Sequence, residues 1–179
     1  MTAEEIIGLL HLVPHPEGGY FAETYRSNES VACGHLPSRY TGDRAFGTAI
    51  YYLLTPGSFS SIHRLASDEV FHFYLGDPVE MVLLFPDGSD EVLLMGPDLT
   101  TGMLPQAVVP AGVWQGARLV PGGAYALLGT TVAPGFDFAD FETGERDILV
   151  ERHPSRAALI TALTRWRPRV TLRWRAPAS

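Results

Sequence analysis

The stretch from Gly57 to Gly76 contains the residue types most able to do chemistry, because His63 and Glu69 lie six residues apart within it. The residues around them are rich in Phe, Ile, Val and Tyr, and the polar step 66–68 supplies a turn, so the pattern predicts strand, turn and strand. His63 and Glu69 would then lie on adjacent strands. An imidazole and a carboxylate so placed can bind a metal, hold a polar ligand or transfer a proton. They can equally form a structural pair.

The composition limits the class of protein. The chain has 179 residues, of which 46% are hydrophobic and 18% charged, which excludes a disordered protein and fits one domain. Its 14 Pro and 18 Gly are spread along the chain and favour a mostly β domain. A formal charge of −7 argues against nucleic-acid binding. All 13 basic residues are Arg, which excludes a lysine Schiff base.

The cysteine count and the hydropathy limit the compartment. Cys33 is the only cysteine, so an internal disulfide and a Cys-rich zinc site are excluded. No apolar run approaches the roughly 20 residues that cross a bilayer, and the first residues lack the order of a signal peptide. We therefore expect a cytoplasmic protein that does not associate with membranes.

The elements that must position the central stretch can be assigned in order along the chain. Thr2 and Glu5 have the spacing of a capping box, which predicts a short amphipathic helix that ends before Pro14. A second helix is predicted over 156–166, with Ser155 as its N-cap. Residues 28–44 are polar, and we expect a loop over the mouth of a pocket. Strands are predicted at 20–26, 45–54, 79–85, 91–95, 106–109, from Gln115 to Arg118, and at 124–132.

Eight or more short strands with helices only at the ends predict a double-sheet jelly roll. Gly57, His63, Glu69 and Gly76 also fall at the spacings of the first cupin motif, and 110–115 resembles the second. The segments 14–21, 63–65, 68–69 and 133–138 are similar to a family of small cupins catalogued as a domain of unknown function. The resemblance implies an all-β cupin double-stranded β-helix, a jelly-roll barrel with short N- and C-terminal helices. It implies one cupin domain at 1–167 and an Arg-rich C-terminal tail at 168–179.

The resemblance also shows where this chain departs from metal-binding cupins. In those proteins two His and a Glu of the first motif and a His of the second form the metal shell, but Leu65 and Gln115 stand at two of the His positions here. Fewer than about three good ligands remain. We therefore predict no cofactor. If a divalent metal binds, its ligands are His63, Glu69 and Gln115. Strand alternation places His72 on the opposite sheet face, where a structural hydrogen bond is expected.

The resemblance to sugar-nucleotide epimerases of the superfamily implies roles for the candidate residues. His63 would be the base, Glu69 or Glu23 would orient it, and Tyr51 or Tyr20 would be the acid. The other candidate ligand-binding residues are Gln106, Gln115, Trp114 as an apolar wall, and Phe136, for which a core role is the alternative. Metal-free epimerase-type or isomerase-type chemistry on a small sugar- or nucleotide-like ligand and non-catalytic binding both stay open. A metal-dependent enzyme is a third interpretation.

The predicted partner besides the small-molecule ligand is a second copy of the chain. Apolar residues recur in the first helix and in the strand that contains Phe21 and Tyr25, and a jelly roll leaves sheet edges to cover. Cupins that resemble this one often pair through their first strands, which would place 14–26 at a homodimer interface. The turn at 17–19 would then reach toward the neighbour's pocket.

Overall fold

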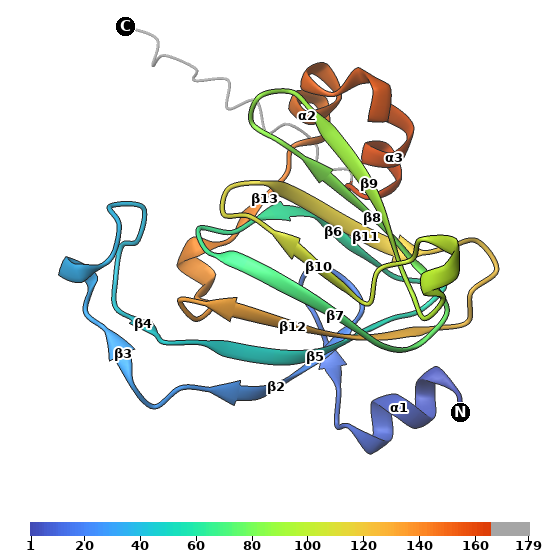
Figure 1. The fold of residues 1–179 in the computed structure, drawn as a ribbon, viewed down its shortest axis with the longest axis horizontal. Helices are drawn as coiled ribbons and strands as arrows, with labels where there is room; N and C mark the ends of the chain where they lie inside the picture. The colour runs from blue at the N-terminus through green and yellow to red at the C-terminus, as the bar shows by residue number, and fades with distance from the viewer. Residues whose placement is uncertain (166–179) are drawn as a thin grey trace, which may run out of the picture.

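The structure, a computed structural model, describes residues 1–165, and within them the strands form two opposed antiparallel sheets (Figure 1). The six-stranded sheet has the order β1 (Val13–Pro14), β2 (Tyr20–Arg26), β5 (Thr48–Leu54), β12 (Ala126–Ala133), β7 (Asp68–Gly76) and β10 (Gln106–Val109). The five-stranded sheet has the order β13 (Glu142–Thr143), β6 (Phe59–Arg64), β11 (Trp114–Leu119), β8 (Val79–Leu84) and β9 (Asp90–Met95). The predicted jelly-roll barrel is confirmed. The tail predicted at 168–179 lies outside the described residues.

The space between the sheets holds the main core, because alternate residues of each strand face the opposite sheet. Tyr52, Leu54 and Phe71 of the six-stranded sheet pack there against Met81 and Leu83 of β8. One end of this interior is apolar and filled. The other end is hollow, is lined by both apolar and polar side chains, and contains the candidate site.

His63 and Glu69 lie on β6 and β7, which belong to different sheets. The expectation that they occupy adjacent strands is therefore wrong. The connection between β6 and β7 crosses from one sheet to the other, where Tyr40 donates to Ala66 O at 3.2 Å and Ser67 donates to Pro134 O at 2.9 Å. Both side chains consequently approach the barrel interior from opposite walls.

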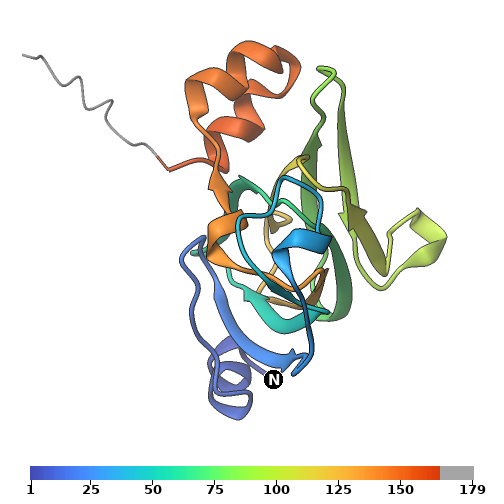
Figure 2. The same cartoon turned by 90° about the vertical axis from the view of Figure 1, so that its left-hand side faces the viewer.

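Short helices lie at opposite ends of the barrel (Figures 1 and 2). Helix α1 (Ala3–Leu9) has the predicted capping box of Thr2 and Glu5, and it packs Ile6 on the outer face of the six-stranded sheet. Helices α2 (Arg146–Arg152) and α3 (Ala157–Ala162) cover the outer face of the five-stranded sheet. Within residues 1–165, no helix has the length and apolar character that crossing a bilayer requires.

The predicted N-cap of the last helix is wrong. Helix α3 begins at Ala157, and Arg156 at its N-cap makes no side-chain capping bond. The Ser155 hydroxyl instead donates to Asp90 Oδ2 at 2.9 Å, and Arg156 pairs with the same carboxylate at 2.5 Å. This carboxylate on β9 draws the Ser155 side chain away from the helix end. The preceding helix α2 was not predicted.

The segment 28–44 forms a small two-stranded sheet of β3 (Ser30–Val31) and β4 (Arg44–Ala45). It does not itself line the main cavity. Arg44 makes a buried ion pair with Asp140 at 2.6 Å, at the end of the 3-10 helix η3 (Phe138–Asp140). Since Phe138 lines the cavity, this loop contributes by holding η3 in place.

Candidate functional site

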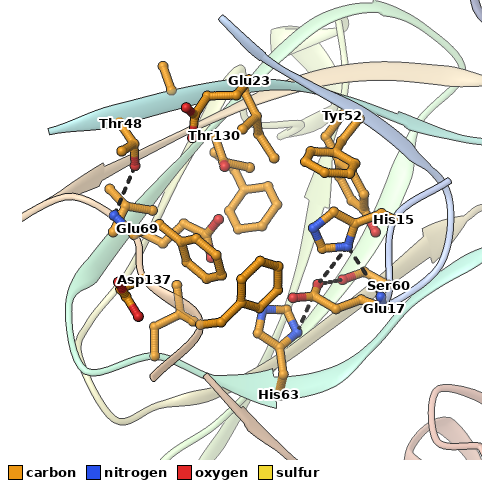
Figure 3. Close-up of a pocket in the computed structure, with 18 of the residues that line it drawn as sticks. His15, Glu17, Glu23, Thr48, Tyr52, Ser60, His63, Glu69, Thr130 and Asp137 are labelled. Carbon is orange, nitrogen blue, oxygen red and sulfur yellow. Dashed lines mark hydrogen bonds and ion pairs between the residues drawn. The ribbon is translucent and has the colours of Figure 1, made fainter. Parts of the chain in front are cut away.

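A cavity of about 290 Å³ opens between the sheets (Figure 3). Its apolar lining comes from the six-stranded sheet, from the residue after β6 and from the segment that leads into the start of η3, and includes Phe21, Ile50, Leu65, Phe71, Val132, Phe136 and Phe138. Its polar lining includes one group of side chains, His15, Glu17, Ser60 and His63, and across the cavity from it a second group that includes Thr48, Glu69 and Asp137 (Figure 3). The mixture of an apolar body with a few convergent polar groups is typical of a small-molecule site.

A β-bulge in β6 turns two polar side chains into the cavity. Gln115 pairs with His63 and Ala117 pairs with Ser60, so one extra residue of β6 lies opposite Gly116. Because of that extra residue, Ser60 and His63 both face inward although their spacing is odd. Gly116 is required opposite the bulge, since a Cβ there would lie 2.7 Å from Ile62 Cγ1.

The turn at 15–19 docks onto this bulge. The amide and the hydroxyl of Ser61 donate to Glu17 O at 3.1 and 2.8 Å, and Tyr52 donates to Gly18 O at 2.8 Å. Gly18 and Gly19 have φ of 118° and 72°, which other residues rarely adopt. The Glu17 side chain therefore lies in the cavity of its own chain. The expectation that this turn reaches a neighbour's pocket is corrected.

The hydrogen bonds of His63 determine which ring nitrogen carries the proton. Nδ1 lies 2.8 Å from Ser61 O, a carbonyl that only accepts, so Nδ1–H donates. The second nitrogen, Nε2, lies 3.4 Å from the Gln115 amide nitrogen, which donates toward it. Burial lowers the pKa of His63, and the nearby Glu69 partly opposes this. The ring is therefore neutral at neutral pH, with its lone pair on Nε2.

Two buried carboxyl groups flank His63. Glu17 Oε2 lies 3.3 Å from His63 Nδ1, and Ser60 donates to the same oxygen at 3.3 Å. Burial raises the pKa of Glu17 to about 8, so this group carries a proton at neutral pH. On the other side Gln115 donates to Glu69 Oε2 at 2.5 Å. Burial raises the pKa of Glu69 as well.

His15 completes the group of polar side chains that contains His63. Its Nδ1 accepts the backbone N–H of Glu17 at 3.2 Å, so its proton is on Nε2. The ring packs edge-on against Phe21, with ring centres 4.6 Å apart, and against Tyr52. Burial lowers the pKa of His15 to about 4, with a further contribution from His63. This imidazole is also neutral.

Several residues predicted from the sequence belong to this cavity. His63, Glu69, Glu23 and Phe136 line it, and Gln115 bridges His63 and Glu69. The Glu23 carboxylate is paired with Arg26 at 2.6 Å, so it does not orient His63. A hydrogen bond of 3.1 Å joins His72 Nε2 and Thr131 Oγ1 outside the cavity, as predicted.

Four predicted residues lie elsewhere. Tyr51 and Tyr20 pack in the cluster around Ile6 on the outer face of the six-stranded sheet, because strand alternation turns Tyr52 inward instead. Gln106 is exposed and contacts His72 at 3.2 Å. Trp114 packs on the outer face of the other sheet, under the guanidinium of Arg64 at 4.5 Å. Neither predicted tyrosine acid reaches the site.

The sequence analysis missed His15, Glu17, Ser60 and Thr130. His15 and Glu17 belong to the segment 14–20, which resembles small cupins and was predicted to lie at the dimer interface, but no role in the cavity of their own chain was predicted for these two residues. The signal that could have found them is the position of two titratable residues between prolines and a pair of glycines, where the backbone is fixed sharply. Ser60 was hidden by the bulge, which breaks strand alternation.

The donor groups do not fit a transition metal. Among residues 1–165, no three His, Cys, Asp or Glu side chains are grouped so that they could hold an ion. The amide N–H groups of Gln115 point at Glu69 and His63, where a metal would need free lone pairs. Leu65 contributes only an apolar surface to the cavity.

Comparisons with known proteins agree with this fold. The family model described as cupin superfamily (DUF985) matches residues 4–144. A hypothetical protein from Leishmania major is 34% identical, with a TM-score of 0.84, over 93% of this chain and 100% of that chain. A protein from Shewanella oneidensis is 32% identical, with a TM-score of 0.82, over 93% and 99% of the two chains.

Two further relatives extend the comparison. An uncharacterized protein of Saccharomyces cerevisiae is 32% identical over 172 residues, which cover 90% of this chain and 86% of that protein. Oxalate decarboxylase from Bacillus subtilis is 14% identical, with a TM-score of 0.51, over 88% of this chain and 37% of that chain. At that identity the likeness is one of fold alone.

Proposed function

This chain belongs to the cupin superfamily, in the family described as DUF985, and from that premise we propose that its cavity binds a small polar molecule and transfers a proton on it. His63 is the base, and no metal takes part. The observation that carries this proposal is the hydrogen bond from His63 Nδ1 to Ser61 O, at 2.8 Å. It leaves Nε2 with a lone pair on a buried, neutral imidazole at the cavity wall.

Glu17 supplies the acid. Its carboxyl group is protonated at neutral pH because burial raises its pKa to about 8. It also lies 3.3 Å from His63 Nδ1, so the carboxylate that remains after Glu17 gives its proton to the ligand stabilises the imidazolium that forms when Nε2 accepts a proton. The pKa of the base and the pKa of the acid are both shifted from their ordinary values, and the two groups lie side by side in one cavity. Proton transfer at neutral pH needs such a pair.

Gln115 and Glu69 position the base. The amide of Gln115 donates to Glu69 at 2.5 Å and toward His63 Nε2 at the longer distance of 3.4 Å. The short bond fixes the amide, and the long bond leaves Nε2 available to a ligand. Gln115 and Glu69 thus hold the ring on its cavity side while Ser61 holds it on the other.

The test is incorporation of deuterium from D2O into small hydroxy, carbonyl and carboxylic metabolites, followed by mass spectrometry after dialysis of the protein against a chelator. We expect the protein to label at least one compound at carbon, and His63→Asn to slow labelling by about 10²–10⁴-fold. Asn can still donate to Ser61 O, so this variant should remain folded. His72→Asn is the matched control, because His72 lies outside the cavity and should leave labelling unchanged.

Two results would overturn the proposal. One is the absence of labelling by the unmodified protein. The other is labelling that His63→Asn preserves. Binding of a library compound without labelling would assign the cavity to a non-catalytic ligand-binding protein instead.

A further inference from the structure

The two imidazoles of the cavity present opposite hydrogen-bonding groups. His15 Nδ1 accepts the Glu17 N–H at 3.2 Å, which leaves Nε2–H as a donor. His63 Nδ1 donates to Ser61 O at 2.8 Å, which leaves Nε2 as an acceptor. Each tautomer is fixed by a backbone group, so a ligand does not change it. The site therefore has one fixed donor on His15 and one fixed acceptor on His63, and the Gln115 amide at 3.4 Å is the group that a ligand would replace at that acceptor.

The Nε2–H group of His15 and the Nε2 atom of His63 can contact the same ligand. Glu17 Oε2 lies between the rings, 3.3 Å from His63 Nδ1 and 3.9 Å from His15 Nδ1. Figure 3 shows both rings beside the Glu17 carboxyl, with the other nitrogen of each ring facing the cavity. The Nε2–H of His15 and the Nε2 of His63 thus face the same cavity, where one small molecule can contact both.

The charges of the cavity select an uncharged molecule. Arg26 is the one Arg or Lys side chain among the described residues that line it, and its guanidinium is already paired with Glu23. An anionic ligand would also meet the carboxyl group of Asp137. A cationic ligand would find Glu17 uncharged at neutral pH, since burial raises its pKa to about 8, and burial raises the pKa of Glu69 as well. Their carboxyl groups, with Thr130 and Ser60, suit ligand hydroxyls instead.

Building on the proposed function, we propose that the substrate is a small uncharged α-hydroxycarbonyl compound. Its carbonyl oxygen accepts from His15 Nε2–H, and the carbon next to the carbonyl, which bears the hydroxyl, gives its proton to His63 Nε2. The volume of about 290 Å³ is at the lower end for ligand pockets and suits a compound of a few carbons.

The proton and electron changes balance without an oxidant or a cofactor. The C–H bond breaks, its electron pair forms a carbon–carbon double bond, and the carbonyl π electrons move onto the oxygen that His15 and the Glu17 carboxyl stabilise. The product of this step is the enediolate of the ligand and an imidazolium at His63. Transfer of the Glu17 carboxyl proton to the enediolate oxygen then gives the neutral enediol and leaves a carboxylate 3.3 Å from His63 Nδ1. Return of the proton from His63 to the neighbouring carbon, with the hydroxyl proton of the adjacent carbon going back to Glu17, gives an aldose–ketose isomer and restores both groups.

The test compares dihydroxyacetone with dihydroxyacetone phosphate, which has the same reacting carbons and a dianionic group. Proton NMR in D2O follows the loss of the CH₂ signals. We expect exchange of dihydroxyacetone above the buffer rate, with kcat/KM at least about tenfold above that of the phosphate. His15→Asn should lower kcat/KM by about a hundredfold, as for the loss of one donor to a developing oxyanion.

A second variant separates ligand contact from a structural role. The amide oxygen of Asn can replace Nδ1 as acceptor for the Glu17 N–H, whereas the amide nitrogen of Gln can replace Nε2–H. His15→Gln should therefore recover part of the exchange that His15→Asn loses. Three results would each overturn the inference. The first is faster exchange of dihydroxyacetone phosphate than of dihydroxyacetone. The others are exchange in His15→Asn equal to that of the unmodified protein, and exchange in His15→Gln no faster than in His15→Asn. Labelling of metabolites in the library assay without exchange of dihydroxyacetone would overturn this inference alone, whereas the absence of both would overturn the proposed function too.

Discussion

Oε2 of Glu17 lies 3.3 Å from Nδ1 of His63, and both groups are buried at the same side of the cavity. Glu17 lies in the turn before β2 and His63 lies on β6, so they meet only because the turn docks on the β6 bulge through Ser61. Burial shifts the pKa of the two groups in opposite directions, upward for the carboxyl and downward for the imidazole. The neutral form of each is favoured, and the pair is prepared to exchange protons with a ligand.

Replacement of Glu17 by Gln should change how stability depends on pH. Between pH 4.5 and about 8 the folded protein holds a proton on Glu17 that the unfolded chain has released. The free energy of unfolding therefore falls as pH rises through this window, by at most about 1.4 kcal/mol per pH unit from this group. In Glu17→Gln the free energy of unfolding does not fall in this way, because the Gln side chain does not titrate. Urea unfolding from pH 5 to 9 should show the variant gaining stability relative to the unmodified protein up to about pH 8, and no further gain above it.

The free energy of unfolding also depends on pH through Glu69, His15 and His63. These groups are present in both proteins, so their direct contributions largely cancel when the two proteins are compared. Two curves that stay parallel from pH 5 to 8 would mean that Glu17 is ionised in the folded protein. The acid would then have to be another group.

Substitution of Gly116 by Ala should destabilise the barrel at the bulge. A Cβ there would lie 2.7 Å from Ile62 Cγ1 and 3.2 Å from Ser60 O, so the strands would have to separate. We expect a loss of about 1–3 kcal/mol in the free energy of unfolding. Gly57→Ala is the control, because a Cβ at Gly57 meets no atom within 4 Å, and it should change stability by less than about 0.5 kcal/mol. Equal effects of the two substitutions would show that the bulge tolerates a side chain.

The side chains around His63 also predict the metal content of the purified protein. We predict that the purified protein contains much less than one tightly bound Mn, Fe, Ni or Zn per chain, and that Leu65→His combined with Gln115→His increases the bound metal. The two substitutions supply imidazoles on either side of the His63 position and remove the Gln115 amide N–H groups. Elemental analysis after dialysis measures both proteins. About one metal ion per unmodified chain would contradict the prediction and favour a metal-dependent enzyme.

We also predict a homodimer through residues 14–26 and their surroundings. Side chains of this region are apolar and exposed, with Leu9 at 68%, Val13 at 52% and Tyr25 at 55%. Light scattering at micromolar concentration should give twice the chain mass, and Tyr25→Asp should shift the protein toward the monomer. A mass near 19.5 kDa for the unmodified protein would contradict the prediction.

The fold could be predicted because its signals are local. The capping box of Thr2 and Glu5 and the apolar strands between turn residues determine most elements. The Gly57–Gly76 stretch identified His63 and Glu69 as cavity residues. Its assignment to one sheet failed because hydrophobic alternation does not indicate whether a short turn continues a sheet or crosses to the opposite one.

The rest of the site depends on long-range packing. Tyr51 and Tyr52 are equally plausible from the sequence, and only the register of β5 in the barrel turns Tyr52 inward. Glu17 enters the cavity because Ser61, 44 positions further along the chain, binds its carbonyl. A bulge such as the one beside Gly116 reverses the direction of side chains without any change in composition.

The most direct measurement of the central claim is a nitrogen-15 NMR spectrum of the histidine side chains at pH 7, assigned with His15→Asn and His63→Asn. The account predicts two neutral rings of opposite tautomer, with the proton of His63 on Nδ1 and that of His15 on Nε2. The assignment of His15 should persist at pH 6, because burial lowers the pKa of this ring to about 4. A protonated His63 at pH 7, or a His63 with its proton on Nε2, would remove the base from the cavity and contradict the account.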